Sequence, residues 1–406
     1  AGSDAGFDAG SDAGFDAGSL QVQVGGSHSC ALNPMGGIRC WGANANGQLG
    51  YGNTVSIGDN ETPMTAGTVS LGAAAQAIAL GATHTCALTA GSVRCWGSGA
   101  AGRLGYGNTS SIGDDESPAA PGTITLGATA TAIAAGQNHT CAILQGGAVT
   151  CWGQGGAGQL GYGNINDVGD NEVPSTAGTV DVGGVVTQLA LGASHTCALL
   201  LGGSVRCWGR GAEGQLGYAN TNNIGDNEAP SSAGNVSLGA SAVLVAAGDQ
   251  HTCALLSTGV VMCWGNGGGG RLGYGSTNNI GDNETPSAEG AVYIGGPVTG
   301  VTAGGEHTCA LRSDGVVCWG SGASGNLGYG NVTAVGDNET PSSAGTVPVG
   351  VSVRTIAAGQ RHTCVASTLS SVHCWGEGTS GRLGYGNVNN VGDNESPSSA
   401  GAVPVF

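Results

Sequence analysis

The chain has 406 residues, of which 82 are glycine and only 4% are aromatic, and its formal net charge is −17. Its ten basic residues are spread thinly, which excludes the clustered Lys and Arg that bind phosphate backbones or anionic membranes, so we expect no nucleic-acid partner. No apolar run approaches the roughly 18 residues of a membrane-spanning helix. So much glycine raises the entropy cost of folding, and the fold therefore needs a further source of stability.

Residues 1–19 form a low-complexity segment that we call the tail. Its first 16 residues are two copies of Ala-Gly-Ser-Asp-Ala-Gly-Phe-Asp, a composition too poor in large apolar residues to build a core. Phe7 and Phe15 recur eight residues apart and are our candidates for subunit contacts. We expect residues 1–18 to dock on a neighbouring copy, a contact that gives a homopolymeric filament when it is repeated. A flexible linker and docking of the tail on its own chain are the alternatives.

A repeat of 55 or 56 residues fills residues 20–406. One copy reads GATHTCAL, GSVRCWG, GRLGYGN, IGDDESP and GTITLG in turn. Its apolar segments are short, are joined by turns that contain glycine, and show no sustained helical period. Seven copies of about four short strands predict an all-β, seven-bladed β-propeller over residues 20–406. The copies are marked by His28, His84, His139, His195, His251, His307 and His362.

The two ends of the repeat region predict how the ring closes. The first copy begins at residues 20–24 and lacks the GTVSLG-type strand that precedes every other copy. Residues 401–405 repeat that strand, and no further copy follows them. We therefore expect the C-terminal strand to pair with the first blade. A linear solenoid would instead need polar caps at both ends.

Fourteen cysteines occur in seven pairs, whose members lie nine or ten residues apart across one predicted hairpin. Facing Cβ atoms on paired strands are close enough for a bond, which predicts one disulfide per blade, with pairing between adjacent blades as the alternative. Each such bond stabilises by roughly 3 kcal/mol in a chain-entropy model. Zinc is disfavoured because no copy has a C-x-x-C knuckle. The predicted pairs are Cys30 with Cys40, Cys86 with Cys95, Cys141 with Cys151, Cys197 with Cys207, Cys253 with Cys263, Cys309 with Cys318, and Cys364 with Cys374.

This cysteine usage predicts an oxidising compartment, because cytosolic thiols are kept reduced. The chain starts with Ala rather than Met and shows no positively charged, apolar leader. We therefore expect a signal peptide that has already been removed, and a secreted protein that is extracellular or attached to the cell surface.

The elements His-Thr-Cys-Ala-Leu, Cys-Trp-Gly and Gly-x-Leu-Gly, with close variants, recur in all seven copies. They resemble the repeat of the regulator-of-chromosome-condensation family. The resemblance implies a seven-bladed propeller and is strongest to the secreted bacterial branch, which has extra cysteines and a Gly-Asp-Asn-Glu loop. The family's founding member acts on a nuclear GTPase while docked on chromatin, but this chain lacks a basic DNA-binding tail. A propeller-shaped β-lactamase inhibitor, which binds a protein on its loop face, is the better precedent.

Seven histidines on equivalent strands suggest a metal ring, but a structural role is the simpler interpretation. We expect each histidine to be a packed side chain that is hydrogen-bonded to a neighbouring blade. We expect one tryptophan to fill the space between each pair of blades rather than to stack on a nucleic-acid base. These residues are Trp41, Trp96, Trp152, Trp208, Trp264, Trp319 and Trp375.

Each copy carries Gly-Asp-Asn-Glu or a close variant, and rotational symmetry places all seven acidic loops on one face or rim. In one interpretation the Asp shapes a turn and the Glu is solvated. In the other, the carboxylates and the Asn of Tyr-Gly-Asn bind calcium, which prefers oxygen ligands. With Asp115 the loops hold 15 of the 27 acidic residues. The pairs are Asp59 with Glu61, Asp114 with Glu116, Asp170 with Glu172, Asp226 with Glu228, Asp282 with Glu284, Asp337 with Glu339, and Asp393 with Glu395.

No copy carries a unique cluster of acid, base and nucleophile, so we expect no enzymatic activity. The near-identical copies favour an extracellular structural protein, the subunit of a homopolymeric filament or surface assembly linked through the tail. The alternative is a monomeric secreted binding module, an inhibitor or adhesin, with a protein or glycan ligand on one loop face. Calcium is the one ion for which we predict a site.

Overall fold

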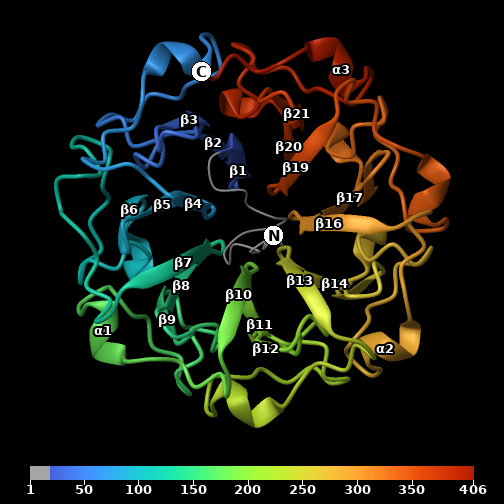
Figure 1. Ribbon diagram of the computed structural model, residues 1–406, viewed down its shortest axis with the longest axis horizontal. Coiled ribbons are helices and arrows are strands. Elements are labelled where there is room, and N and C mark those ends of the chain that lie inside the picture. Colours follow the sequence, from blue (N-terminus) through green and yellow to red (C-terminus); the bar gives the residue numbers. More distant parts are fainter. Residues whose placement is uncertain (1–18) are drawn as a thin grey trace, which may run out of the picture.

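The computed structural model describes residues 19–406, which form seven β-sheets around a central axis (Figure 1). Each sheet has three antiparallel strands in chain order, which confirms the all-β, seven-bladed β-propeller. Phe7 and Phe15 lie outside the described residues, so the predicted subunit contacts stay predictions.

In each blade the three strands step outward from the axis (Figure 1). The innermost strands are β1 (Gln21–Val24), β4 (Ala77–Leu80), β7 (Ala130–Ala135), β10 (Val186–Leu191), β13 (Ala242–Ala247), β16 (Val298–Ala303) and β19 (Val353–Ala358). The middle strands are β2 (His28–Leu32), β5 (His84–Thr89), β8 (His139–Leu144), β11 (His195–Leu200), β14 (His251–Leu256), β17 (His307–Arg312) and β20 (His362–Ser367). The outer strands are β3 (Ile38–Gly42), β6 (Ser92–Gly97), β9 (Val149–Gly153), β12 (Val205–Gly209), β15 (Val261–Gly265), β18 (Gly315–Gly320) and β21 (Val372–Gly376).

Outside the third strand the chain returns along the rim as a fourth, irregular segment. In the first blade, Ile57 forms a bridge with Gly42, and the amide of Val69 donates to the carbonyl oxygen of Ile38 (2.9 Å). Between these points most blades form one helical turn that begins at Pro, whose fixed φ and missing N–H suit a first helical position. These turns are Pro63–Ala66, α1 (Pro174–Ala177), Pro230–Ala233, α2 (Pro286–Glu289), Pro341–Ala344 and α3 (Pro397–Ala400). Single 3-10 turns follow the outer strands at Ala100–Gly102, Gly268–Gly270, Ala323–Gly325 and Thr379–Gly381.

The predicted pairing of the C-terminal strand with the first blade is wrong. The amide of Val403 donates to the carbonyl oxygen of Val372 in β21, within the seventh blade. Each fourth segment therefore belongs to the blade whose outer strand precedes it in the chain. The first blade has its own fourth segment and is not missing a strand. The C-terminal segment still reaches the first blade, because Met64 N donates to Pro404 O (3.0 Å). The ring closes with the same kind of bond that joins other blades, such as Ser175 N to Thr125 O (3.1 Å).

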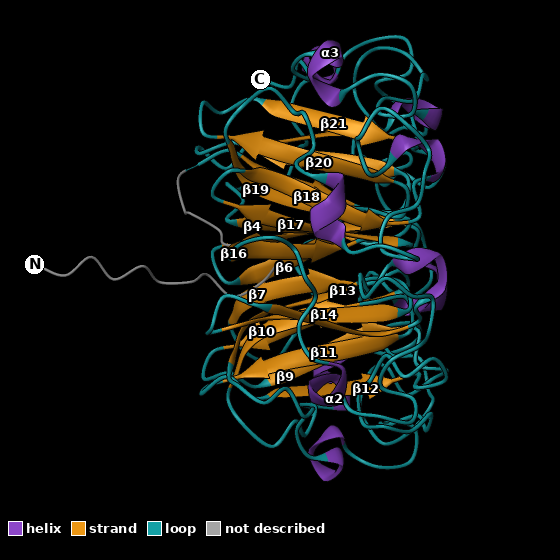
Figure 2. Cartoon of the chain, turned by 90° about the vertical axis from the view of Figure 1, so that its right-hand side faces the viewer, coloured by secondary structure: helices purple, strands orange, loops and turns teal. Residues whose placement is uncertain are grey.

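The two faces of the ring differ in the length of their connections (Figure 2). The turns between middle and outer strands, such as residues 33–37, define what we call the hairpin face. The long connections after the outer strands, such as residues 43–62, define the loop face. The chain enters β1 at the hairpin face, because Gln21 pairs with Leu32 beside that turn. Within residues 19–406 no helix has the length and apolar character needed to span a membrane.

Disulfides join the middle and outer strands of every blade, which confirms the predicted pairs. The bonded cysteines face each other in register, with Cα atoms 4.1 Å apart at Cys141 and Cys151, and all fourteen are fully buried. The alternative of pairing between adjacent blades is therefore excluded. The bonds join Cys30 to Cys40, Cys86 to Cys95, Cys141 to Cys151, Cys197 to Cys207, Cys253 to Cys263, Cys309 to Cys318, and Cys364 to Cys374.

Candidate functional site on the loop face and the axis

The acidic loops lie at the loop-face end of each fourth segment, where they form tight turns. Glu61 Oε1 accepts a hydrogen bond from the amide of Gly58 (3.1 Å), and Glu339 Oε1 accepts one from Gly336 (3.2 Å). Glu284 and Glu395 repeat this contact. In the other three copies the Glu accepts from the amide of the residue directly before it. These are Glu116, Glu172 and Glu228. All seven carboxylates therefore stabilise the turn that holds them.

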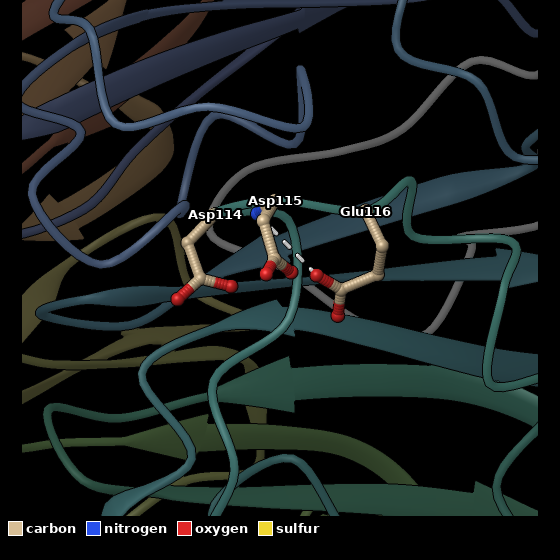
Figure 3. A group of neighbouring side chains, drawn as sticks. All are labelled: Asp114, Asp115 and Glu116. Carbon is tan, nitrogen blue, oxygen red and sulfur yellow. Dashed lines mark hydrogen bonds between the residues drawn. The ribbon is translucent and has the colours of Figure 1, made fainter.

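The seven Glu residues predicted to bind calcium are engaged in these local contacts, whereas one carboxylate oxygen each of Asp59, Asp170 and Asp282 is buried without a hydrogen-bond partner among the described residues. The Asn of Tyr-Gly-Asn caps its own turn, since Asn53 Oδ1 accepts from the amide of Val55 (2.9 Å). Among the described residues, three acidic side chains come together only at Asp114, Asp115 and Glu116 (Figure 3), whose carboxylate oxygens lie within 4.8 Å of one another. Burial, and then the neighbouring Asp115, raise the pKa of Glu116. Calcium binding stays a prediction, which calorimetric titration with Ca²⁺ tests directly.

The acidic loops also pack between blades. A Cβ atom added to Gly47 in the first blade would lie 2.4 Å from the backbone nitrogen of Asp114 in the second. In the same way, a Cβ atom added to Gly381 in the seventh blade would lie 2.3 Å from the backbone nitrogen of Asp59 in the first. Glycine is needed at these positions because its φ is positive, +76° at Gly47, and because no side chain fits. The Gly-x-Leu-Gly element thus cradles the acidic loop of the next blade.

Each histidine bonds to the next blade, as predicted. His195 Nε2 lies 2.9 Å from Thr252 Oγ1, and that hydroxyl donates to the carbonyl oxygen of Gln215 (3.0 Å). Because the hydroxyl uses its only hydrogen on the carbonyl, it accepts from the histidine, so Nε2 carries the proton. Trp264 Nε1 donates to the same carbonyl oxygen (2.9 Å). All seven tryptophans are fully buried, which confirms their predicted place between blades.

Burial keeps these histidines neutral. It lowers the pKa of His139 to about 3 and that of His195 to about 4. Nδ1 of every repeat histidine is buried and has no hydrogen-bond partner among the described residues. This arrangement suits packing rather than metal binding, because Nε2 already donates to the next blade and Nδ1 lies against the backbone of a glycine, such as Gly192 beside His195.

A ring of seven glycines surrounds the axis just before the histidines. A Cβ atom on Gly192 would lie 2.2 Å from His195 Cε1 and 2.4 Å from Gly248 O in the next blade. Main-chain bonds such as Asp249 N to Gly304 O (3.3 Å) join neighbouring blades here. This ring was not predicted from the sequence, although a glycine three residues before each histidine was its signal. The members are Gly25, Gly81, Gly136, Gly192, Gly248, Gly304 and Gly359.

The glycine ring lines a cavity of about 110 Å³ on the axis, towards the loop face, which we call the axial well. The residue after each ring glycine also lines it or lies beside it, and in four blades that residue is Gly or Ala. In the other three it is Gln137, Asp249 or Gln360. Burial raises the pKa of Asp249, and the Gln137 side chain opposes that effect. The axial well is thus a place where the described ring departs from its sevenfold repeat.

Comparisons with known proteins agree with this architecture. The ultraviolet-B receptor UVR8 of Arabidopsis thaliana is 32% identical over 371 residues, which are 90% of this chain and 79% of the receptor. The structure of yeast RCC1 (Prp20) bound to Kap60 superposes with a TM-score of 0.70 at 18% identity, over 97% of this chain and 85% of that one. A structure of Prp20p from Saccharomyces cerevisiae, studied with its binding to Gsp1p and histones, gives 0.64 at 19% identity, over 84% and 80%. At these identities the two solved structures show the fold.

Two sequence models of the regulator of chromosome condensation (RCC1) repeat match the chain. One matches residues 20–48, 130–159, 186–215, 242–271 and 298–326. The other matches residues 36–88, 90–143, 146–199 and 202–255, more than half of the chain. With seven blades of one pattern and a relative that matches almost throughout, the chain belongs to the family of proteins built from regulator of chromosome condensation (RCC1) repeats.

Proposed function

We propose that the chain is a non-catalytic, extracellular structural protein whose copies join through residues 1–18 into a filament or surface assembly. The observation that carries this proposal is the place where the tail attaches. Leu20 is buried and leads directly into β1, an innermost strand, at the hairpin face. The Arg354 guanidinium donates to the carbonyl oxygen of Leu20, which ties this start point to the seventh blade. The described part of the chain therefore starts near the axis of the ring, at the point to which residues 1–18 are covalently joined.

An axial attachment point favours stacking over other geometries. A segment anchored near the axis can reach the central region of a second ring placed face to face with the first. Because the hairpin face and the loop face differ, such a contact is heterologous, and it generates an open chain of subunits. Two phenylalanines in an otherwise small and polar segment supply its apolar anchors.

Deletion of residues 1–18 tests the assembly. We expect full-length protein to form filaments in negative-stain images and the deletion variant to stay monomeric in light scattering. A double variant, Phe7→Ser with Phe15→Ser, should behave like the deletion, whereas the matched Ser3→Ala with Ser11→Ala should assemble normally. Filaments that persist without the tail would overturn the proposal.

An extracellular location is supported by the seven buried disulfides, since such bonds persist in oxidising compartments. Protein from its native source, unfolded without reductant, should therefore take up no thiol-reactive polymer. Uptake of fourteen equivalents by freshly isolated protein would contradict this location.

A secreted binding module that uses the loop face is the second candidate. It is favoured by the protein partners of the similar propeller, which are Kap60, Gsp1p and histones, and by the acidic loops on this face. A protein ligand or a glycan would fit this role. Full-length protein that stays monomeric at high micromolar concentration would favour this candidate over the filament.

A further inference from the structure

We propose that the axial well binds the ammonium group of a lysine side chain from a partner protein. Asp249, Gln137 and Gln360 line the well and offer carboxylate and carboxamide oxygens. An ammonium has three N–H donors and no acceptor, so these oxygens match it. This inference goes beyond the proposed filament and does not rest on it.

The well is large enough to take the end of a side chain. Its volume is about 110 Å³, whereas a single water needs only roughly 10–15 Å³ measured in the same way. The glycine ring narrows the well, because each ring glycine lies against the carbonyl oxygen of the next. A lysine side chain has an unbranched four-carbon stem and carries its charge at the tip.

The carboxylate of Asp249 is not paired with a basic side chain among the described residues. Burial raises the pKa of its carboxyl, with Arg271 and Gln137 opposing that effect and Glu306 reinforcing it. Arg271 is committed elsewhere, since its guanidinium donates to the carbonyl oxygens of Gly268 (2.7 Å) and Gly305 (3.3 Å). Asp249 forms no ion pair within the described part of the chain. An incoming ammonium would compensate a carboxylate that burial otherwise disfavours.

The negative charge of the loop face would attract a partner that carries a positive charge. The acidic loops at the loop face hold 15 acidic residues, and a field of one sign raises the association rate of an oppositely charged partner. All ten basic residues of the sequence are arginines, and it contains no lysine. None of these 406 residues, in this copy or in a second one, can therefore supply a lysine side chain.

Binding of a short peptide tests the proposal. The probe is acetyl-Gly-Gly-Lys-Gly-Gly-amide, titrated into the full chain by NMR, with its Nε-acetyl-lysine form as the neutral comparison and n-butylamine as the free-amine comparison. We expect saturable shifts at the amides of residues 248–250 with the lysine peptide and none with the acetylated one. Saturation by n-butylamine with equal affinity would show that the well takes small amines, and would overturn the commitment to a protein side chain.

Two matched variants separate the well from the general charge of the face. Asp249→Asn should weaken the peptide at least tenfold, whereas Asp226→Asn, which removes the same charge from an acidic loop, should change its affinity less than twofold. Gln360→Ala, which leaves every charge in place, should weaken it about threefold and guards against misfolding of the Asp249 variant. Equal losses at Asp249 and Asp226, or no saturable binding, would overturn the proposal. The chain lacking residues 1–18 should bind the peptide unchanged, which keeps this result separate from filament assembly.

Discussion

At each blade interface the histidine ring has one satisfied nitrogen and one that is buried without a partner. His195 donates from Nε2 to Thr252 Oγ1, and its Nδ1 faces the backbone of Gly192. The charged or titratable groups that act on the pKa values of the repeat histidines are arginines and other histidines, never carboxylates. A proton added to Nδ1 would therefore meet no acceptor and no opposite charge.

The first prediction concerns the stability of the fold at acidic pH. The folded pKa of His195, about 4, lies below its unfolded value of roughly 6.5, so its neutral form contributes stability that is complete above pH 6.5. That contribution, on the order of 3 kcal/mol, is lost as the pH falls towards 4. Urea unfolding between pH 6 and 4.5 gives the slope of the unfolding free energy against pH. We expect this slope to be smaller in His195→Gln than in the unchanged protein, by about 1.4 kcal/mol per pH unit. An unchanged slope would mean that His195 is charged in the folded ring.

A second prediction at this scale concerns the glycine ring. Gly192→Ala places a methyl group 2.2 Å from His195 Cε1 and 2.4 Å from Gly248 O, so neighbouring atoms must move. We expect the free energy of unfolding to fall by roughly 1–3 kcal/mol, as overpacked sites do. Gly156→Ala is the matched control, because nothing lies within 4 Å of the added Cβ atom. Equal melting temperatures for the two variants would contradict the close approach.

At the scale of the element, the unit of the structure is a hairpin fastened by a disulfide. In β8 and β9, Cys141 faces Cys151, and both are fully buried. The middle strand is buried along its whole length, so reductant reaches the bond only when the blade opens. The disulfides thus stabilise blades whose large apolar side chains are few.

Removing one such bond gives the third prediction. Cys141→Ser with Cys151→Ser should lower the free energy of unfolding by roughly 3 kcal/mol. The double change avoids a free thiol and leaves six disulfides intact. The native protein should also resist millimolar dithiothreitol until denaturant is added, which thiol-reactive labelling and mass spectrometry measure. Rapid reduction of the folded protein would show that the hairpins open readily.

Periodicity predicts elements better than it predicts their boundaries. The spacing of His, Cys and Trp correctly indicated the hairpins, the disulfide pairs and the contacts between blades. The fourth segment was assigned to the wrong blade, because a repeat has a period but no marked starting point. The bonds between fourth segments and outer strands, such as Val403 to Val372 and Val69 to Ile38, show where a blade ends. The polar side chains of the axial well, such as those of Gln137 and Asp249, were missed because the residue type at their position differs from blade to blade.

At the scale of the whole molecule, the ring is held at the junction of its last and first blades by contacts of several kinds. His362 Nε2 bonds to Ser29 Oγ (2.9 Å), and the hydroxyl of Ser29 donates to Arg382 O (3.0 Å). Arg39 donates to the carbonyl oxygen of Val405, and its guanidinium lies 5.1 Å from the centroid of the Phe406 ring. The C-terminal segment therefore fastens the seventh blade to the first.

Deletion of residues 401–406 is the fourth prediction. It removes the bond from Val403 to β21 and the contacts with Met64 and Arg39, so we expect the melting temperature to fall by about 5 °C or more, the shift expected for a few kcal/mol. Limited proteolysis should then cut first near this junction. Deletion of residues 1–18 is the control and should leave the melting temperature unchanged. A C-terminal deletion that is equally stable would mean that the other contacts of the junction suffice.

The junction between the seventh and first blades resembles the junctions between consecutive blades, which has a consequence for the order of the blades along the chain. Since the bonds between the seventh and first blades repeat those between covalently continuous neighbours, the fold does not depend on which blade is translated first. A circular permutant tests this idea, with residues 406 and 20 joined by a flexible linker and new ends opened between Leu201 and Gly202, where Leu201 is 73% exposed. We expect the permutant to fold into the same seven-bladed propeller with the same seven disulfides, although a different blade then lies at each end of the polypeptide.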